Sequence, residues 1–255
     1  MKRFFLAALL GGLLAPAARA CDICGCGVSY YNPYLFPHLA KSYVGLSYFH
    51  RVYRTAGHEG SWSHERYNTL LLMMQYSVGR KLQLQALLPW QANTLSNESG
   101  ARSLSGMGDI SLMGQYRLWE RNSDKGVRQA LLLGAGVKLA SGRFVPATTS
   151  KAEDQNFQLG TGSTDLLFNG SYRISLRRWT FSGVGSYKYN TPNKDGYRYG
   201  DVVNTGVQAA YRQEWRQWSL TPYAQVNYEW QLAQDLAGGQ IRVEPRLAVR
   251  TSITF

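Results

Sequence analysis

Three cysteines close together form the most chemically distinctive stretch of this sequence. Cys21, Cys24 and Cys26 make a C-x-x-C-x-C pattern, and His38 follows twelve residues later. Three thiolates at this spacing can converge on one soft ion, Cu(I) or Zn(II), with His38 as a candidate fourth ligand. The same thiols could instead form one disulfide with a spare cysteine, or Cys21 could carry a lipid. The sequence therefore predicts one bound copper or zinc ion, with disulfide chemistry and lipidation as alternatives.

The residues that precede the cysteines have the order of a secretory signal peptide. A basic start at Lys2 and Arg3 is followed by an apolar run and by a small-x-small cleavage site that ends at Ala20. The segment after the cut contains several Tyr, Leu and Phe residues, so we expect it to pack against the inner mouth of the domain that follows, either in the periplasm or as a plug in the lumen. The expected organisation is a signal peptide at 1–20, a periplasmic Cys-rich segment at 21–40 and a β-barrel at 41–255.

A second set of candidate residues comes from an internal repeat. Asp109 to Arg117 matches Asp165 to Arg173 at the Asp, Gly, Tyr and Arg positions, and a looser copy ends at Arg212. Because side chains alternate along a strand, each Asp and its Arg share one face. One interpretation is hairpin duplication alone. The other is a lumen with acidic groups at its outer mouth and basic groups at its inner mouth. The candidate lumen residues are Asp109, Arg117, Asp165, Arg173, Arg212, Arg242, Arg246 and Arg250.

Period-two alternation predicts the elements that position these residues. We expect ten strands, at 41–54, 66–78, 80–91, 107–119, 127–141, 163–175, 178–190, 200–214, 217–231 and 240–255. Short turns alternate with longer loops, which we expect at 55–65, 92–106, 142–162, 191–199 and 232–239. This arrangement is typical of an antiparallel transmembrane β-barrel with both termini in the periplasm. The strand count carries an uncertainty of two, so a twelve-stranded barrel is the alternative.

The side of the wall that meets lipid follows from charge. A charged residue at mid-bilayer on the lipid face costs about 2–4 kcal/mol, so Arg242, Arg246 and Arg250 are expected to face the lumen. A soluble lipocalin-like barrel is the alternative, with the apolar face turned inward. Aromatic residues such as Trp90, Tyr116 and Trp179 fall near strand ends, as expected for belts at the two membrane interfaces.

Composition excludes several classes of protein. The 255 residues are 44% hydrophobic, 13% aromatic and 17% charged, which argues against disorder. Beyond the signal peptide no apolar run is long enough for a transmembrane helix. The net charge of +12 could suggest nucleic acid, but lumen arginines and anionic lipid head groups explain it, so no nucleic-acid partner is expected. The expected lipid partners are outer-membrane lipid and lipopolysaccharide, and the expected state is a monomer.

Three stretches carry resemblances to known barrels. The pattern from Gly106 to Arg117, its echo from Gly162 to Arg173, and Leu87-Leu88-Pro89 resemble the outer-membrane transporter barrels first associated with phenol meta-cleavage pathways. This resemblance implies an outer-membrane β-barrel with an uptake role, of a kind that can have about twelve strands. The terminal Phe255 resembles the signal that the barrel assembly machinery recognises. The cysteine segment is similar to the mature start of uncharacterised bacterial barrels.

The function predicted from these features is passage of a small solute or metal across the outer membrane, without catalysis. The lumen arginines would favour anions or negatively charged complexes. One alternative is a barrel that captures or senses metal through its cysteines without transporting it. Another is an outer-membrane hydrolase whose rim would offer His58, His64, Asp109 and Asp165.

Overall fold

Alternating side chains run through twelve strands that pair in one antiparallel sheet. The computed structural model describes residues 42–56, 62–98, 100–124, 126–144, 157–194, 196, 198–215, 218–234 and 241–254. The strands are β1 (Tyr43–Ala56), β2 (Trp62–Val78), β3 (Leu82–Asn97), β4 (Gly100–Met107), β5 (Ser111–Asn122), β6 (Val127–Lys138), β7 (Asp165–Leu176), β8 (Trp179–Tyr189), β9 (Asp201–Tyr211), β10 (Gln213–Trp215), β11 (Trp218–Gln234) and β12 (Ile241–Thr254). No helix in these ranges is long and apolar enough to cross a bilayer.

The strands pair in chain order, and two of them are interrupted. β4 and β5 both pair with β3, and β9 and β10 both pair with β11, so each couple is one strand with a break. Counting each couple once gives ten strand positions, from β1 at one edge to β12 at the other. Within the described ranges no pairing joins β1 to β12. The prediction of an all-β, antiparallel fold is confirmed, and the twelve strands occupy ten positions in the sheet.

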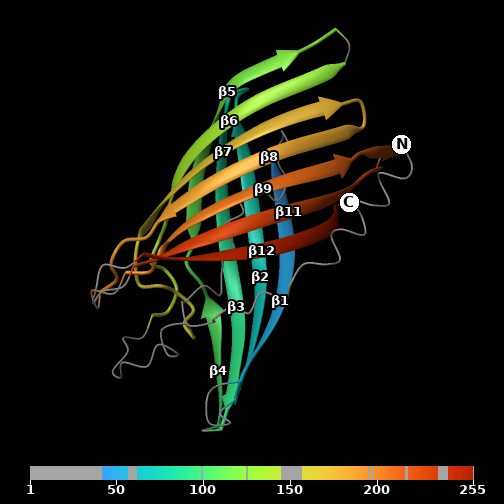
Figure 1. The fold of residues 1–255 in the computed structure, drawn as a ribbon. Helices are drawn as coiled ribbons and strands as arrows, with labels where there is room; N and C mark the ends of the chain where they lie inside the picture. The colour runs from blue at the N-terminus through green and yellow to red at the C-terminus, as the bar shows by residue number, and fades with distance from the viewer. Residues whose placement is uncertain are drawn as a thin grey trace.

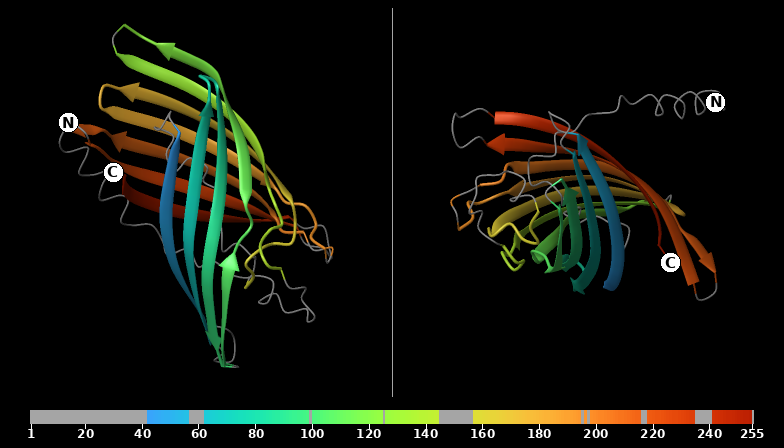
Figure 2. Two further views of the ribbon diagram at one scale, coloured as in Figure 1. Left: turned by 180° about the vertical axis from the view of Figure 1, so that it is seen from behind. Right: turned by 90° about the horizontal axis from the view of Figure 1, so that it is seen from below.

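The sheet is strongly curved and forms a half-barrel. Figure 1 shows β1, β2 and β3 running steeply across the direction of β6 to β12. Seen from below, the same strands form an arch (Figure 2). The right-handed twist of each strand accumulates across the sheet and gives it this curvature. The concave side of the arch is called the inner face below, and the convex side the outer face.

Short turns gather at one end of the strands. They connect β2 to β3, β5 to β6, β7 to β8 and β10 to β11. Gly79 and Gly126 adopt φ values of 64° and 75° in two of them, a conformation that glycine accepts at low cost. Tyr43 pairs with Gln75, and Thr254 pairs with Thr221, so β1 starts and β12 finishes at this same end. An even strand count predicts this placement.

Two of the expected loops are largely strand. β2 already begins at Trp62, and β3 continues to Asn97 and pairs with β4 across the range 92–106. The polar composition of this range suggested a loop, but Asn93 and Leu95 still alternate inward and are buried. β2 has 17 residues, which at about 3.3 Å each exceeds the ~30 Å of a hydrocarbon core. Strand outside the membrane needs no apolar outer face, which explains the polar sequence.

Candidate functional site

The two faces of the sheet have opposite chemistry, and the polar face is the buried one. On the outer face Val44, Leu46 and Val207 are each more than 60% exposed. On the inner face Gln115 and Gln225 are 3% exposed or less. This is the reverse of a water-soluble sheet and is the arrangement of a barrel wall with lipid outside. The alternation expected in 80–91 is present, since Leu84 and Trp90 are exposed and Gln83 is buried.

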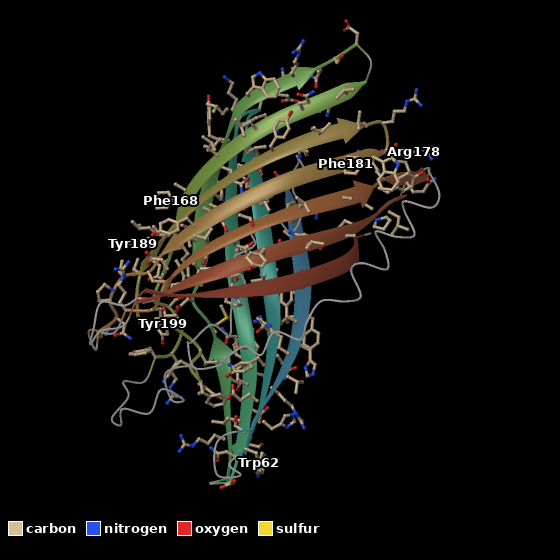
Figure 3. The ribbon with its side chains drawn as sticks, viewed as in Figure 1. Trp62, Phe168, Arg178, Phe181, Tyr189 and Tyr199 are labelled. Carbon is tan, nitrogen blue, oxygen red and sulfur yellow. The ribbon has the colours of Figure 1, made fainter. Side chains whose placement is uncertain are left out.

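Aromatic side chains mark both ends of the outer face. Figure 3 shows Phe181 near Arg178 at the short-turn end, and Phe168 and Tyr189 toward the opposite end. At the short-turn end the rings of Trp179 and Tyr211 lie 4.9 Å apart, and Trp179 stacks on Phe181 at 6.0 Å. These amphipathic rings suit the two membrane–water interfaces.

The acidic residues predicted at the outer mouth belong to a buried ion cluster. Lys138, the last residue of β6, places its Nζ 2.9 Å from Asp109 Oδ2 and 2.6 Å from Asp165 Oδ2. The lysine is 1% exposed, and Asp165 is fully buried. The strand register brings them together, because Lys138 pairs with Asp165 across β6 and β7 and with Ser111 across β5 and β6. We call Asp109, Lys138 and Asp165 the rim cluster.

The rim cluster ties long connections to the strand ends. Asp109 accepts hydrogen bonds from the backbone N–H of Gly142 at 3.0 Å and from the N–H of Thr161 at 2.9 Å. The hydroxyl of Thr161 also donates to Asp109 at 2.9 Å, and Lys138 Nζ donates to that hydroxyl. Asp165 accepts the N–H of Thr191 at 3.0 Å. Both carboxylates therefore act as anchors for loop backbone.

The third copy of the repeat makes the same kind of anchor. Asp201 accepts the N–H of Asn190 at 2.9 Å and the hydroxyl of Tyr187 at 2.6 Å. Arg198 takes the place of the lysine, with its Nη2 3.0 Å from Asp201 Oδ1. All three copies thus use an Asp at the start of a strand, or two residues before it, to bind a following or preceding loop, which supports the structural interpretation of the repeat for its acidic residues.

Glycines let the long β6–β7 connection approach the rim closely. A Cβ on Gly160 would lie 2.6 Å from Asp109 Oδ1, and one on Gly142 would lie 2.7 Å from the Cα of Gly160. The loop then reaches the inner face of β2 and β3. Gln91 Nε2 donates to the carbonyl of Leu159 at 3.2 Å, and the ring of Phe157 lies 6.5 Å from that of Tyr67. The described part of this connection therefore packs against the inner face of β2 and β3.

The arginines predicted to line the lumen differ from one another in burial and in contacts. Arg173 lies on the inner face and is 7% exposed. Arg117 is next to a bulge in β5 and places its Nη1 2.7 Å from Glu120. Arg212 lies at the break between β9 and β10, with a half-exposed side chain 3.5 Å from Glu214. In the β12 register, Arg242, Arg246 and Arg250 stand opposite Ala233, Glu229 and Gln225.

Carboxamides dominate the inner face, and the sequence interpretation gave them no role. Gln85 donates to Gln75 at 2.6 Å, and Gln115 donates to Gln85 at 3.4 Å. On the far side Gln225 donates to Asn227 at 2.9 Å. The period-two signal was present in Gln83 and Gln85, but it could not show which amides meet across strands.

Glycines also make room for these amides. A Cβ on Gly134 would lie 2.3 Å from Asn169 Oδ1, and one on Gly206 would lie 2.3 Å from Asn227 Oδ1. In each case an asparagine amide covers a glycine on the neighbouring strand. A larger residue at either glycine would displace an amide from the inner wall.

The inner face also has an apolar part. Leu71, Met73 and Leu87 form a buried cluster on β2 and β3, with Tyr43 and Phe49 of β1 packed against it. β2 and β3 therefore carry apolar side chains such as Leu71 beside buried amides such as Gln75 and Gln83 on the same face. A hollow of about 900 Å³ is lined by residues of β1, β2, β3, β5 and β6, among them the small residues Gly114 and Ala135.

The predicted metal site lies outside the described residues, as do the signal peptide, Cys21, Cys24, Cys26, His38 and Phe255. In the ranges that the structure describes, no group of three or more His, Cys, Asp or Glu side chains could hold a metal ion. His58 also lies outside these ranges. His64 is described, but no hydrogen bond found among the described residues joins it to Asp109 or Asp165.

Comparison with known proteins agrees with the resemblance carried by the repeat. A family model described as "Putative MetA-pathway of phenol degradation" matches residues 66–254. An outer membrane channel of known structure from Pseudomonas putida F1 is similar over 84% of this chain and 95% of its own length, with 16% sequence identity and a TM-score of 0.44. No curated protein matches the chain.

Proposed function

We propose that this chain forms an outer-membrane β-barrel through which a small polar solute passes. The chain belongs to the family whose description is "Putative MetA-pathway of phenol degradation". The observation that carries the proposal is the inverted wall. Its buried inner face is rich in Gln and Asn amides, while its exposed outer face carries valine, leucine and aromatic side chains. A polar interior inside an apolar band is what a water-filled path through lipid requires.

Arg173 supports a preference for anions. It is a buried cation on the inner wall near the end of β7, whereas the rim carboxylates lie at the start of that strand and are paired with Lys138. Among the lumen residues whose side chains the structure describes, Arg173 is a buried cation that lies away from the rim cluster. A cationic ring or wall residue selects for anions in a pore. We expect the short-turn end to face the periplasm and the outer face to contact outer-membrane lipid and lipopolysaccharide.

No catalytic role is proposed. A general acid or base needs a carboxylate or imidazole within hydrogen-bond reach of a reacting group. Asp109 and Asp165 instead contact Lys138 and loop backbone N–H groups. Those contacts favour anchoring over proton transfer.

The test is ion conductance and selectivity of the full mature chain in planar bilayers. Under a KCl gradient we expect a reversal potential that indicates anion preference, and Arg173→Gln should reduce this preference severalfold. Arg212→Gln is the matched control, because it removes an arginine that is exposed and paired with Glu214. A folded protein without conductance above the bare bilayer would refute passage. Equal effects of the two substitutions would refute the assignment of selectivity to Arg173.

A further inference from the structure

The hollow of about 900 Å³ lies near the short-turn end, where β1, β2 and β3 join β5 and β6. Two rows of side chains border it, and within each row the residues on neighbouring strands oppose each other in register. One row runs from Val44 of β1 to Val137 of β6, and the other from Tyr76 of β2 to Ala135 of β6. We call the space between these rows the outer groove.

The outer groove opens on the outer face of the sheet. Val44 and Tyr76, one from each row, are 74% and 65% exposed. Between the rows each strand contributes one inner-face residue, such as Gln85 of β3. Among the described residues, the lining includes neither Gln83 nor Leu87, the next inner-face residues on that strand. A hollow on the inner side would contact them, so the groove faces the side that we assign to lipid.

The shape and lining of the outer groove suit a hydrocarbon chain. It extends across five adjacent strands, about 19 Å, but only between two rows about 7 Å apart along each strand. Leu84 and Leu112 contribute apolar walls, while the small residues Ala86 and Gly114 leave the space between them. An elongated apolar groove of this kind buries a flexible chain along its length, and the buried apolar area stabilises the complex.

Two cations lie at the short-turn end of the groove. Lys81 places its Nζ 5.9 Å from the ring centre of Tyr116, which is two residues from Gly114 on the same face of β5. Arg80 and Lys81 are both exposed, and in the part of the chain that the structure describes no ion pair engages either of them. Tyrosine rings such as that of Tyr116 favour the depth of lipid head groups. The cations therefore lie at head-group depth, with the groove beginning one to two residues further along β3.

We infer that the outer groove binds an anionic glycerophospholipid, with the phosphate at Arg80 and Lys81 and an acyl chain between the two rows. This inference rests on the membrane placement proposed above and adds a specific lipid site to the outer face. Basic residues at a membrane surface attract anionic lipids, and arginine and lysine are the usual phosphate-binding side chains. A zwitterionic head group would bring its own cation beside Arg80 and Lys81, so the site should favour an anionic one.

The experiment measures lipid binding to the full mature chain by native mass spectrometry from detergent. The probes are phosphatidylglycerol with palmitoyl and oleoyl chains, phosphatidylcholine with the same chains, and dihexanoyl phosphatidylglycerol. Long-chain phosphatidylglycerol should bind with one molecule per chain and at least tenfold more tightly than either of the others. The choline lipid tests the head group, and the short-chain lipid tests the groove.

Filling the groove is the sharpest test of its role. Gly114→Leu places a side chain in the space, and a Cβ there would have its nearest neighbour, Leu84 Cδ2, at 3.9 Å. It should weaken long-chain phosphatidylglycerol at least fivefold, as should Ala135→Leu. Gly170→Leu is the matched control, because Gly170 holds the same position of the repeat on β7, has similar space for a Cβ, and lies outside the lining of the groove. It should change binding less than twofold.

Removing the cations tests the head-group half of the site. The double variant Arg80→Gln with Lys81→Gln should lower the affinity for phosphatidylglycerol to that for phosphatidylcholine. Arg178→Gln is its control, since Arg178 is an exposed cation at the same end of the strands, in the β7–β8 turn (Figure 3). It should change binding less than twofold. Heat-modifiable gel mobility verifies that each variant is folded.

Lipid binding and passage can fail separately. Equal affinity for phosphatidylglycerol and phosphatidylcholine overturns the inference, as does equal weakening by Gly114→Leu and Gly170→Leu. A dimer that Gly114→Leu dissociates, without a lipid preference, assigns the groove to a second copy of the chain and also overturns it. Conductance without phosphatidylglycerol preference overturns the lipid site and leaves passage intact, whereas the expected lipid binding without conductance supports the site and refutes passage.

Discussion

Removing the lysine of the rim cluster should destabilise the barrel strongly. Lys138→Met keeps the length of the side chain but leaves Asp109 and Asp165 beside each other without a cation. Lys138 lies 2.9 Å from one carboxylate and 2.6 Å from the other, and all three residues are at most 7% exposed. Loss of one partner from a buried ion pair costs about 3–5 kcal/mol, because the remaining charge stays desolvated. We expect a loss in this range.

The assay is urea unfolding of the full mature chain in detergent micelles, followed by tryptophan emission. With a denaturant dependence of about 2 kcal/mol per molar urea, the expected loss lowers the unfolding midpoint by about 2 M. Lys194→Met is the control, since this lysine is exposed in the β8–β9 connection and its loss should change stability by less than about 0.5 kcal/mol.

Removing the charge at all three positions tests whether the loss of stability comes from unpaired carboxylates. The variant Lys138→Met with Asp109→Asn and Asp165→Asn no longer buries an unpaired charge, and its amides can still accept the N–H groups of Thr161 and Thr191. It should recover most of the stability lost in Lys138→Met alone. A midpoint for Lys138→Met that matches Lys194→Met would refute the buried ion cluster. A triple variant less stable than Lys138→Met would refute the explanation by unpaired charge.

Two further predictions concern the wall and the cysteines. Val207→Arg, at an outer-face position 64% exposed in the middle of β9, should cost about 2–4 kcal/mol, whereas Leu176→Arg at the strand end should cost less than about 1 kcal/mol. Equal costs in urea unfolding from lipid vesicles would contradict the assignment of this face to lipid. Elemental analysis of anaerobically purified mature protein should find about one copper or zinc ion per chain, lost when Cys21, Cys24 and Cys26 are all changed to Ser. Negligible metal in both proteins would leave disulfide or lipid chemistry for these cysteines.

The face of the sheet on which each side chain lies was predictable from sequence wherever the strands are regular. The assignment of Arg173 and Gln83 to one face and Leu84 to the other follows from alternation, and burial agrees with it. The alternation between the two faces breaks at a β-bulge. The register shifts between Arg117 and Trp119, so Leu118 and Trp119 are both exposed although they are consecutive. The spacing of residues along β5 does not reveal the bulge, because the bulge depends on how β5 pairs with the neighbouring strand.

Contacts between strands were the part that sequence could not supply. Lys138 was inside an expected strand, but its meeting with Asp109 and Asp165 depends on how β5, β6 and β7 align. The meeting of Gln208 with Gln225 likewise requires the β9–β11 register. A repeat of Asp and Arg is visible along the chain, whereas the partner of each charge is a property of the sheet.

The partners decide what each charge of the repeat does. The acidic residues are engaged by Lys138 and by loop N–H groups, and these contacts stabilise the ends of the strands. The acidic residues of the repeat therefore anchor loops at the rim of the sheet.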